Sequence, residues 1–206
     1  HIDGKHSSGI IQIIGNDGRT IKQAALSRTE SGEKLSNESM EEIIHDAIFT
    51  FEKTYDYRPK HITIHRDGRS FEDLPFIQTL AKRLQVKIDY VEITKQMNRR
   101  MVSYSKPKWF TVQGLTYIKE NYAYLCATSP HAKVGIAQPI KIVQLTDNLN
   151  IEEIVKDVYA LSFMHIHSLN KTRLPVTTYY ADLSSTFHNK NYMKVGSKHE
   201  SSLAFV

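Results

Sequence analysis

Residues 61–94 read HITIHRDGRSFEDLPFIQTLAKRLQVKIDYVEIT, and this stretch decides the fold class. HITIH is a compact β-branched strand, residues 70–84 carry apolar side chains with helical period, and QVKIDYVEI returns as a second strand. A strand, a helix and another strand in this order are typical of parallel strands joined by a right-handed crossover. The sequence therefore predicts an α/β domain.

The segment before this stretch predicts a hairpin and a helix. IIQIIGNDGRTIKQAALS has an Asp-Gly turn between two apolar runs, which is a strong hairpin signal. Asn37 or Ser36 can then cap a helix that runs to about Tyr55, because its apolar residues recur at helical spacing.

Beyond residue 95 the expected elements are shorter. WFTVQG, YAYLCATS and QPIKIVQL predict three strands, and apolar spacing predicts a helix from Ile151 to about His165. LPVTTYYADLSSTF predicts an extended entry, anchored by proline, into a last helix that begins near Tyr180.

Length and composition exclude several classes of protein. The 206 residues are 40% apolar and 24% charged, which suits one large folded domain and excludes a disordered chain. A single cysteine, Cys126, cannot form an internal disulfide, so a reducing compartment fits. The chain has neither a spanning apolar stretch nor a signal peptide, so we expect a cytoplasmic protein with no membrane partner. A start on His rather than Met suggests missing upstream sequence.

Basic residues are concentrated in one part of the chain. The net charge is +5, and residues 93–146 contain eight Lys or Arg against one acid, Glu120. Such clustering indicates a polyanionic partner, because phosphates attract Lys and Arg and release counterions on binding. A basic surface that is merely solvated is the alternative. In the same part, Trp109, Phe110 and Tyr117 stand at strand spacing, and we interpret them as core residues rather than a base-stacking surface.

Two aspartates stand where metal-dependent chemistry could be built. Asp67 follows the strand HITIH at its carboxyl end, where open α/β sheets place ligand sites, and the next glycine lets the backbone turn closely. Asp182 follows the Pro-led stretch LPVTTYYA far along the chain. If the fold brings them together, the two carboxylates can hold Mg²⁺ or Mn²⁺ against a scissile phosphate. A turn residue at Asp67 and a plain helix N-cap at either position are the alternatives.

Three features in combination resemble the PIWI domain of Argonaute proteins, most of all the long prokaryotic ones. They are RDG after a strand, the Leu-Pro…Tyr-Ala-Asp module in LPVTTYYADL, and a chain that stops soon afterwards on the apolar FV. The resemblance runs from about Gly9 to Val206. It implies an RNase H-like fold, an α/β architecture with a central mixed β-sheet flanked by helices. It further implies a single PIWI domain over residues 1–206, an N-terminally truncated part of a larger Argonaute.

The resemblance also implies an activity. PIWI domains of this kind are guide-directed endonucleases that cut one phosphodiester of a target strand, with two Mg²⁺ or Mn²⁺ ions held by an Asp-Glu-Asp-Asp/His tetrad. Asp67 matches the third member and Asp182 the fourth. Glu33, in a Gly-Glu context before the first long helix, matches the glutamate finger, with Glu30 and Glu38 as flanking alternatives.

The first aspartate of the tetrad is where the chain departs from the family pattern. In the family this residue ends an apolar strand, whereas only His1 and Ile2 precede Asp3. We therefore expect Asp3 to be a loop residue and the first ligand to lie upstream, with Asp3 itself as the alternative ligand. Under this interpretation the chain alone lacks one metal ligand and is inactive.

The resemblance assigns contacts with nucleic acid as well. Some of these positions follow QVKIDYVEI near the duplex backbone, and others lie near the guide's 5′ segment. They are Lys95, Arg99, Arg100, Lys171, Arg173 and Tyr179. The terminal carboxylate of Val206 is implied to help hold a cation beside a 5′-phosphate pocket shared with a MID domain. The implied partners are a guide strand, a target strand and that MID domain. DNA and RNA are not distinguished, because both are held mainly by phosphates.

Two rival functions stay open. A guide-binding and target-binding PIWI module that does not cut is the main rival, because the first tetrad position is not matched. Another RNase H-like nuclease, such as a Holliday-junction resolvase or a transposase core, would not explain LPVTTYYADL.

Overall fold

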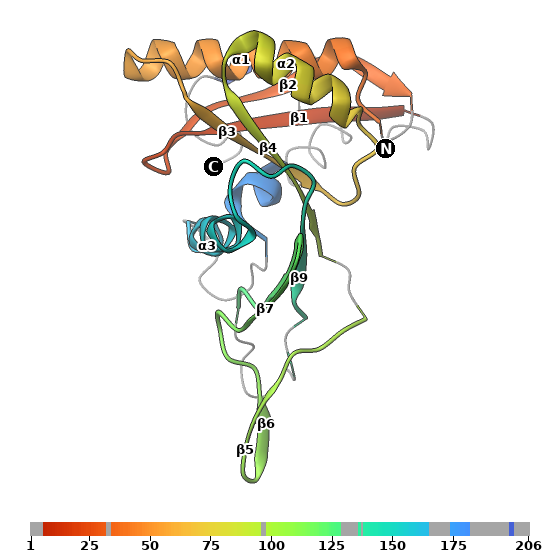
Figure 1. Ribbon diagram of the computed structural model, residues 1–206, viewed down its shortest axis with the longest axis vertical. Helices are drawn as coiled ribbons and strands as arrows, with labels where there is room; N and C mark the ends of the chain where they lie inside the picture. Colours follow the sequence, from red (N-terminus) through yellow and green to blue (C-terminus); the bar gives the residue numbers. More distant parts are fainter. Residues whose placement is uncertain are drawn as a thin grey trace. The chain divides into compact units, whose positions relative to one another are not determined.

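The computed structural model describes residues 6–31, 34–95, 98–128, 136, 138–164, 174–181 and 198–199. The chain divides into two units, and Figure 1 labels the helices and strands of both. Unit 1 comprises His1–Ile62, Ser70–Ile88 and Tyr180–Val206, and unit 2 comprises Thr63–Arg69 and Asp89–Tyr179. None of the helices in the described ranges combines the length and the apolar character needed to cross a membrane.

Unit 1 contains the hairpin that the Asp-Gly turn predicts. β1 (His6–Ile14) pairs antiparallel with β2 (Thr20–Ser31), and β10 (Lys198–His199) also pairs antiparallel with β2, so the sheet order is β1-β2-β10. Gly18 in the turn has a φ of 80°, a left-handed conformation that glycine adopts without steric cost.

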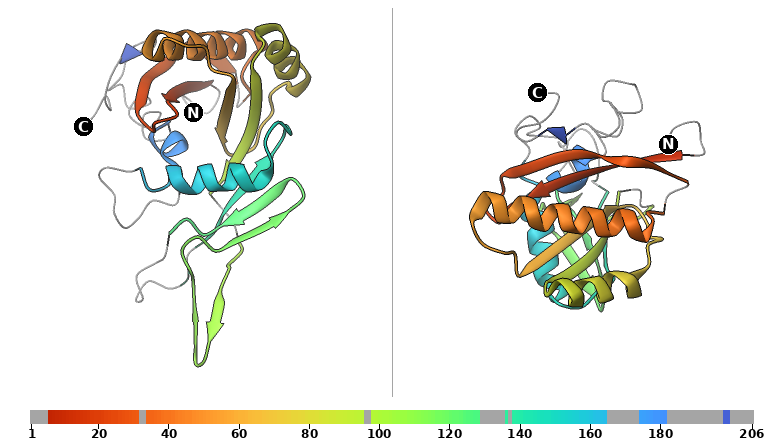
Figure 2. Two further views of the ribbon diagram at one scale, coloured as in Figure 1. Left: turned by 60° about the vertical axis from the view of Figure 1, so that its left-hand side comes forward. Right: turned by 90° about the horizontal axis from the view of Figure 1, so that it is seen from above.

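α1 (Asn37–Tyr55) confirms the helix expected after the hairpin and begins at a side-chain cap. The hydroxyl of Ser36 accepts a hydrogen bond from the Ser39 N–H at 3.2 Å, which satisfies one of the free donors at the helix start. Met40, Ile44 and Ile48 are buried along one face at helical spacing. The helix contacts β2, along which it lies in Figure 2.

α2 (Leu74–Leu84) begins later than the expected residue 70. The carboxylate of Glu72 accepts hydrogen bonds from the Ser70 hydroxyl at 2.6 Å and from the Phe71 N–H at 2.9 Å, so these residues form a local turn. The helix starts only at Asp73, whose carboxylate caps the Phe76 N–H at 3.1 Å.

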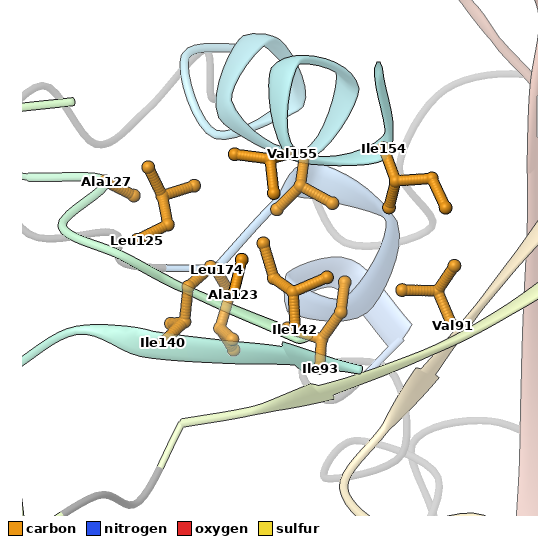
Figure 3. Packing of buried hydrophobic residues seen from close by; sticks show 11 residues of the cluster. Val91, Ile93, Ala123, Leu125, Ala127, Ile140, Ile142, Ile154, Val155 and Leu174 are labelled. Atoms are coloured by element: carbon orange, nitrogen blue, oxygen red, sulfur yellow. The ribbon is translucent and has the colours of Figure 1, made fainter. Parts of the chain in front are cut away.

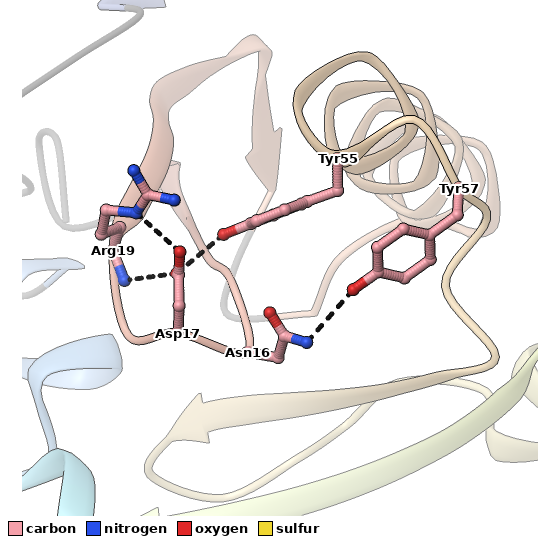
Figure 4. A network of polar contacts seen from close by, with 5 residues as sticks. All are labelled: Asn16, Asp17, Arg19, Tyr55 and Tyr57. Atoms are coloured by element: carbon pink, nitrogen blue, oxygen red, sulfur yellow. Dashed lines mark hydrogen bonds and ion pairs between the residues drawn. The ribbon is translucent and has the colours of Figure 1, made fainter.

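A network of polar contacts joins the β1–β2 turn to the end of α1 (Figure 4). The Tyr55 hydroxyl donates to Oδ1 of Asp17 at 2.7 Å, and the backbone N–H and guanidinium of Arg19 donate to the same carboxylate at 3.0 and 2.6 Å. These bonds, with that of Tyr55 the largest cause, lower the pKa of Asp17 to about 2.

The same turn brings Gly15 close to the ring of Tyr55. A Cβ added to Gly15 would lie 2.0 Å from the Tyr55 hydroxyl oxygen, far inside any contact distance. Beside this close approach, the side-chain amide of Asn16 donates to the Tyr57 hydroxyl at 3.1 Å (Figure 4). The end of α1 and the turn therefore fit together through specific contacts.

A five-stranded sheet of order β3-β4-β9-β8-β7 forms most of unit 2. Its strands are β3 (His61–Asp67), β4 (Lys87–Thr94), β7 (Thr116–Lys119), β8 (Tyr122–Leu125) and β9 (Ile140–Gln144). β3 and β4 run parallel, because the Lys87 N–H donates to the Lys60 carbonyl at one end and the Gly68 N–H donates to the Ile93 carbonyl at the other. The remaining pairs are antiparallel, so the sheet is mixed, as expected.

The strand expected over WFTVQG is wrong in its extent. β6 (Lys108–Phe110) ends at Phe110 and pairs only with β5 (Ser103–Ser105), in a separate two-stranded hairpin. The backbone then turns through Gly114, which has a φ of 83° and donates its N–H to the Cys126 carbonyl at 2.9 Å. This turn leads into β7, which the sequence pattern did not predict.

The core of unit 2 lies between the sheet and α3 (Ile151–Leu161), as Figure 3 shows. Its buried residues are Val91, Ile93, Ala123, Leu125, Ala127, Ile140, Ile142, Ile154, Val155, Val158 and Leu174. α3 begins with a capping box between Asn150 and Glu153. It ends before the expected limit near residue 165, with Ser162 as its C-cap, whose hydroxyl donates to the Val158 carbonyl at 2.8 Å.

A buried carboxylate fixes the connection from β9 to α3. Asp89, on β4, is 0% exposed. Its oxygens accept hydrogen bonds from the Thr146 hydroxyl at 2.8 Å and from the N–H groups of Asn148 and Leu149, both at 3.0 Å. A buried carboxylate is tolerated only with such partners, so this connection has one conformation set by β4.

We expect Asp89→Ala to lower the free energy of unfolding by about 3 kcal/mol, because it leaves the buried Thr146 hydroxyl and two part-buried backbone N–H groups without their acceptor. Urea unfolding of the two proteins measures the difference. Asp147→Ala removes an exposed carboxylate from the same connection and should change stability by less than about 0.5 kcal/mol. Equal effects of the two substitutions would contradict the role given to Asp89.

Candidate functional site

Asp67 lies at the carboxyl end of β3, as the sequence predicts. The next residue, Gly68, has a φ of 84° and donates its N–H to the Ile93 carbonyl at 2.9 Å, which keeps the end of β3 beside β4. The Asp67 carboxylate is 3.3 Å from Nζ of Lys95, which directly follows β4. Parallel strands end at the same edge of a sheet, so this edge brings together two charges that are distant in the sequence.

A second contact attaches the Leu-Pro segment to the same strand. His65 precedes Asp67 by two residues, so both side chains project from one face of β3. The Nδ1 atom of its ring lies 2.8 Å from the Thr177 hydroxyl oxygen. Burial lowers the pKa of His65 to about 4, so the ring is neutral at neutral pH.

The residues around Thr177 form a short helical turn. Residues 176–181 are helical, whereas the sequence analysis expected the helix to begin near Tyr180. It starts earlier because the Pro175 carbonyl accepts hydrogen bonds from the N–H groups of Thr178 and Tyr179 at 3.1 and 3.0 Å. Leu174 belongs to the unit 2 core. The segment that precedes Asp182 is thus fixed to β3 and to the core.

Several predicted site residues lie outside the described residues. They are Asp3, Glu33, Lys171, Arg173, Asp182 and Val206. Of the alternatives to Glu33, Glu38 is exposed in the first turn of α1, and the backbone of Glu30 belongs to β2. The approach of Asp182 to Asp67 therefore stays a prediction.

The predicted metal ligands lie only partly among the described residues. Within the ranges that the structure describes, no three His, Cys, Asp or Glu side chains gather in a way that could hold a metal ion. Of the predicted metal ligands, Asp67 is the one among the described residues, and its carboxylate offers the hard oxygen donors that Mg²⁺ and Mn²⁺ favour. One carboxylate fits such an ion chemically but does not complete a site, and further ligands have to come from other candidates.

The basic residues after β4 that can be placed lie in unit 2. Arg99 and Arg100 are exposed, and the Arg99 guanidinium lies 5.1 Å from the centre of the Tyr124 ring on β8. Tyr179 is half-buried and packs against the unit 2 core. A cation–π contact thus holds Arg99 at the exposed surface of unit 2.

The prediction that Trp109, Phe110 and Tyr117 are core residues is wrong. They are 62%, 43% and 51% exposed. Alternation identifies a strand but does not say which of its faces is covered, and β5 and β6 form a hairpin apart from the main sheet.

His65, Thr177 and the pairing of Lys95 with Asp67 were not assigned from the sequence. The spacing of His65 from Asp67 signals a shared face. Lys95 could be found only by knowing that β3 and β4 are neighbours, because the contact depends on the sheet order rather than on local sequence.

Comparison with known proteins adds independent findings. A family model described as the Piwi domain matches residues 4–193. The chain is 26% identical over 183 residues to the protein argonaute of Aquifex aeolicus (strain VF5), which covers 87% of this chain and 25% of that protein. It is 25% identical over 173 residues to the protein argonaute of Marinitoga piezophila, covering 84% of this chain and 26% of that protein. The chain thus spans about a quarter of the length of these relatives.

Solved structures show the same likeness. Clostridium butyricum Argonaute, bound to a guide DNA and a 19-mer target DNA, has a TM-score of 0.79 at 21% identity, covering 98% of this chain and 29% of that chain. A. aeolicus Argonaute has a TM-score of 0.71 at 20% identity, again covering 98% of this chain and 29% of that chain.

These similarities and the mixed sheet define the class of fold, which is RNase H-like. The chain belongs to the Piwi domain family.

The lowered pKa of His65, a half-buried residue in contact with Thr177, predicts a pH dependence of stability. The unfolded chain binds a proton on His65 below its ordinary pKa of 6.5, whereas the folded chain does so only near pH 4. The free energy of unfolding should therefore fall as the pH is lowered from about 6.5 to 4, by at most about 3 kcal/mol from this group.

Urea unfolding at a series of pH values measures this loss. His65→Gln should flatten the curve in that window, whereas His45→Gln, at an exposed position on α1, should leave its slope unchanged. An unchanged slope in the His65 variant would show that another group causes the loss.

Proposed function

We propose that this chain, over residues 1–206, is the PIWI nuclease domain of a longer Argonaute and cuts one phosphodiester of a target strand paired to a guide strand. The observation that carries the proposal is the link between two motifs of the family. The 2.8 Å contact of His65 with Thr177 attaches the segment before Asp182 to the strand that ends in Asp67. Membership of the Piwi domain family supports the same conclusion.

The catalytic carboxylates in this proposal are Asp67, Asp182 and Glu33. Asp67 and Asp182 hold the cation, and Glu33 completes the site when a guide–target duplex is seated. The first ligand lies upstream of the sequence or is Asp3. Two Mg²⁺ or Mn²⁺ ions, when bound, supply an activated water and charge stabilisation for the leaving oxygen.

Lys95 has a positioning role beside Asp67. Its ammonium is 3.3 Å from Oδ2, and the two side chains are 33% and 28% exposed, so the charges are partly shielded from water. A carboxylate has two oxygens, so an ammonium on one of them orients the group without occupying both. The same ammonium can meet the phosphate of a strand bound at this edge, since a lysine offers three donors.

The proposed partners are a guide strand, a target strand and a MID domain of the same longer protein. Two structural neighbours support the nucleic-acid partners: the Clostridium butyricum complex, and Marinitoga piezophila Argonaute in complex with a 5′ OH guide RNA and a target DNA. We propose backbone contacts by Lys95, Arg99, Arg100, Lys171, Arg173 and Tyr179. Val206 is part of the same proposal, as a residue beside a cation at the guide's 5′-phosphate. A cytoplasmic location is part of the same proposal.

A second candidate function is a PIWI module that binds guide and target without cutting. It shares the family and the proposed nucleic-acid contacts with the first candidate and differs from it only in the cleavage step. Cleavage by the full-length protein in Mn²⁺ or Mg²⁺ decides between the two functions.

We expect Asp67→Asn, in the full-length protein, to lower target cleavage by on the order of 100-fold or more while guide and target binding persist, because it removes a ligand charge without changing shape. Cleavage is measured in Mn²⁺ and binding in Ca²⁺. The control is Asp56→Asn, at an exposed left-handed position where asparagine is well tolerated. Cleavage near the wild-type rate would remove Asp67 from the active site.

Arg99→Ala combined with Arg100→Ala should weaken duplex binding equally for all sequences, because phosphate contacts carry no sequence information. The slope of log affinity against log salt should fall by roughly one to two. A double variant at the exposed Lys53 and Lys60 of unit 1 keeps the same change of net charge and should leave the slope unaltered. An equal fall in the salt slope of both double variants would show that net charge alone causes the effect.

A further inference from the structure

The β5–β6 hairpin presents a pair of aromatic rings to solvent. Tyr104 and Trp109 are direct partners in its antiparallel register, so their side chains share one face. Their ring centres are 4.6 Å apart, and the residues are 52% and 62% exposed. Phe110, opposite Ser103, lies on the other face and is 43% exposed. Large aromatic surfaces left in water at neighbouring positions mark a contact surface for another molecule.

The hairpin lies within the most basic part of the chain. Between Lys95 and Lys119 the sequence has six Lys or Arg and no Asp or Glu. Two of these cations, Lys106 and Lys108, belong to the hairpin itself, and both are exposed. Its partner therefore carries negative charge together with flat apolar groups.

We propose that the β5–β6 hairpin binds single-stranded nucleic acid, with unpaired bases stacked on Trp109 and Tyr104 and the backbone held by Lys106 and Lys108. Stacking on an aromatic side chain needs an open base face, which a duplex offers only at its ends. The hairpin thus binds a strand that has not yet paired, or the part of a strand that extends beyond the paired region. The inference goes beyond the proposed function, because it requires neither cleavage nor a metal.

Charge and shape disfavour two other occupants. A second copy of the chain would bring together two hairpins that each carry Lys106 and Lys108 within the same basic segment, which is repulsive. A hairpin that enters a membrane carries its apolar side chains at the tip, whereas this tip reads Ser105-Lys106-Pro107-Lys108. Phosphates and bases match both properties of the hairpin.

The chain offers a direct reporter for the test, because Trp109 is its only tryptophan. We expect oligo(dT) of about 15 nucleotides to quench the fluorescence of Trp109 in a saturable way, since a stacked base lies against the indole. Added salt should reverse the quenching, because the backbone contacts release counterions. A blunt duplex of the same length should quench less.

Substitutions then measure the contribution of the ring. Trp109→Ala should weaken the binding of a labelled oligo(dT) by on the order of 10-fold, and Trp109→Phe should retain most of the affinity because it keeps an aromatic face. The matched control is Phe49→Ala, at a 65% exposed aromatic position on α1, which should leave affinity unchanged. Circular dichroism establishes that each variant is folded.

Three results would overturn the proposal. Unchanged affinity in Trp109→Ala, with no quenching in the wild type, would remove the hairpin from the nucleic-acid surface. Quenching by vesicles that contain phosphatidylglycerol, but not by oligo(dT), would assign the surface to a membrane. Quenching that depends only on protein concentration would assign it to a second copy of the chain. None of these measurements uses cleavage, so they leave the proposed nuclease function to be judged separately.

Discussion

The parallel pairing of β3 with β4 is the constraint on which the candidate site depends. β4 is buried along most of its length, with Val91 and Ile93 in the unit 2 core, so its register cannot shift without exposing apolar side chains. With that register fixed, both strands end at the same edge. At this edge the Asp67 carboxylate and the Lys95 ammonium form an ion pair of 3.3 Å. The Gly68 N–H donates a hydrogen bond to the Ile93 carbonyl beside it.

Local signals explain why much of the fold could be predicted from sequence. The Asp-Gly turn of the hairpin, the Ser36 cap of α1 and the strand that ends at Asp67 each depend on neighbouring residues, and all three are confirmed. The start of α2 was missed because Glu72 bonds back to Ser70, an alternative to the helix that propensity does not reveal. The elements that could not be predicted depend on contacts between segments that are distant in the sequence.

The candidate site, like the fold, has parts that local sequence predicts and parts that depend on distant contacts. Asp67 was found because it follows a strand, and its position is confirmed. The partner Lys95 and the His65–Thr177 contact depend on which segments the fold brings together, so no sequence spacing could reveal them. Trp109 shows the converse limit, because an alternating pattern does not reveal whether a layer covers the strand, and among the described residues this side chain is 62% exposed. Exposure is a property of the whole fold rather than of a pattern.

The close approach of Gly15 to Tyr55 has a consequence for how related sequences can vary. A residue with a Cβ at position 15 has no room while the phenol of Tyr55 stands 2.0 Å from that point. A side chain at position 15 therefore requires the Tyr55 ring to move aside or to be replaced by a smaller side chain. Either change would cost Asp17 the hydrogen bond that lowers its pKa most. The sequence of the turn and the last residue of the helix are thus coupled through one phenol ring.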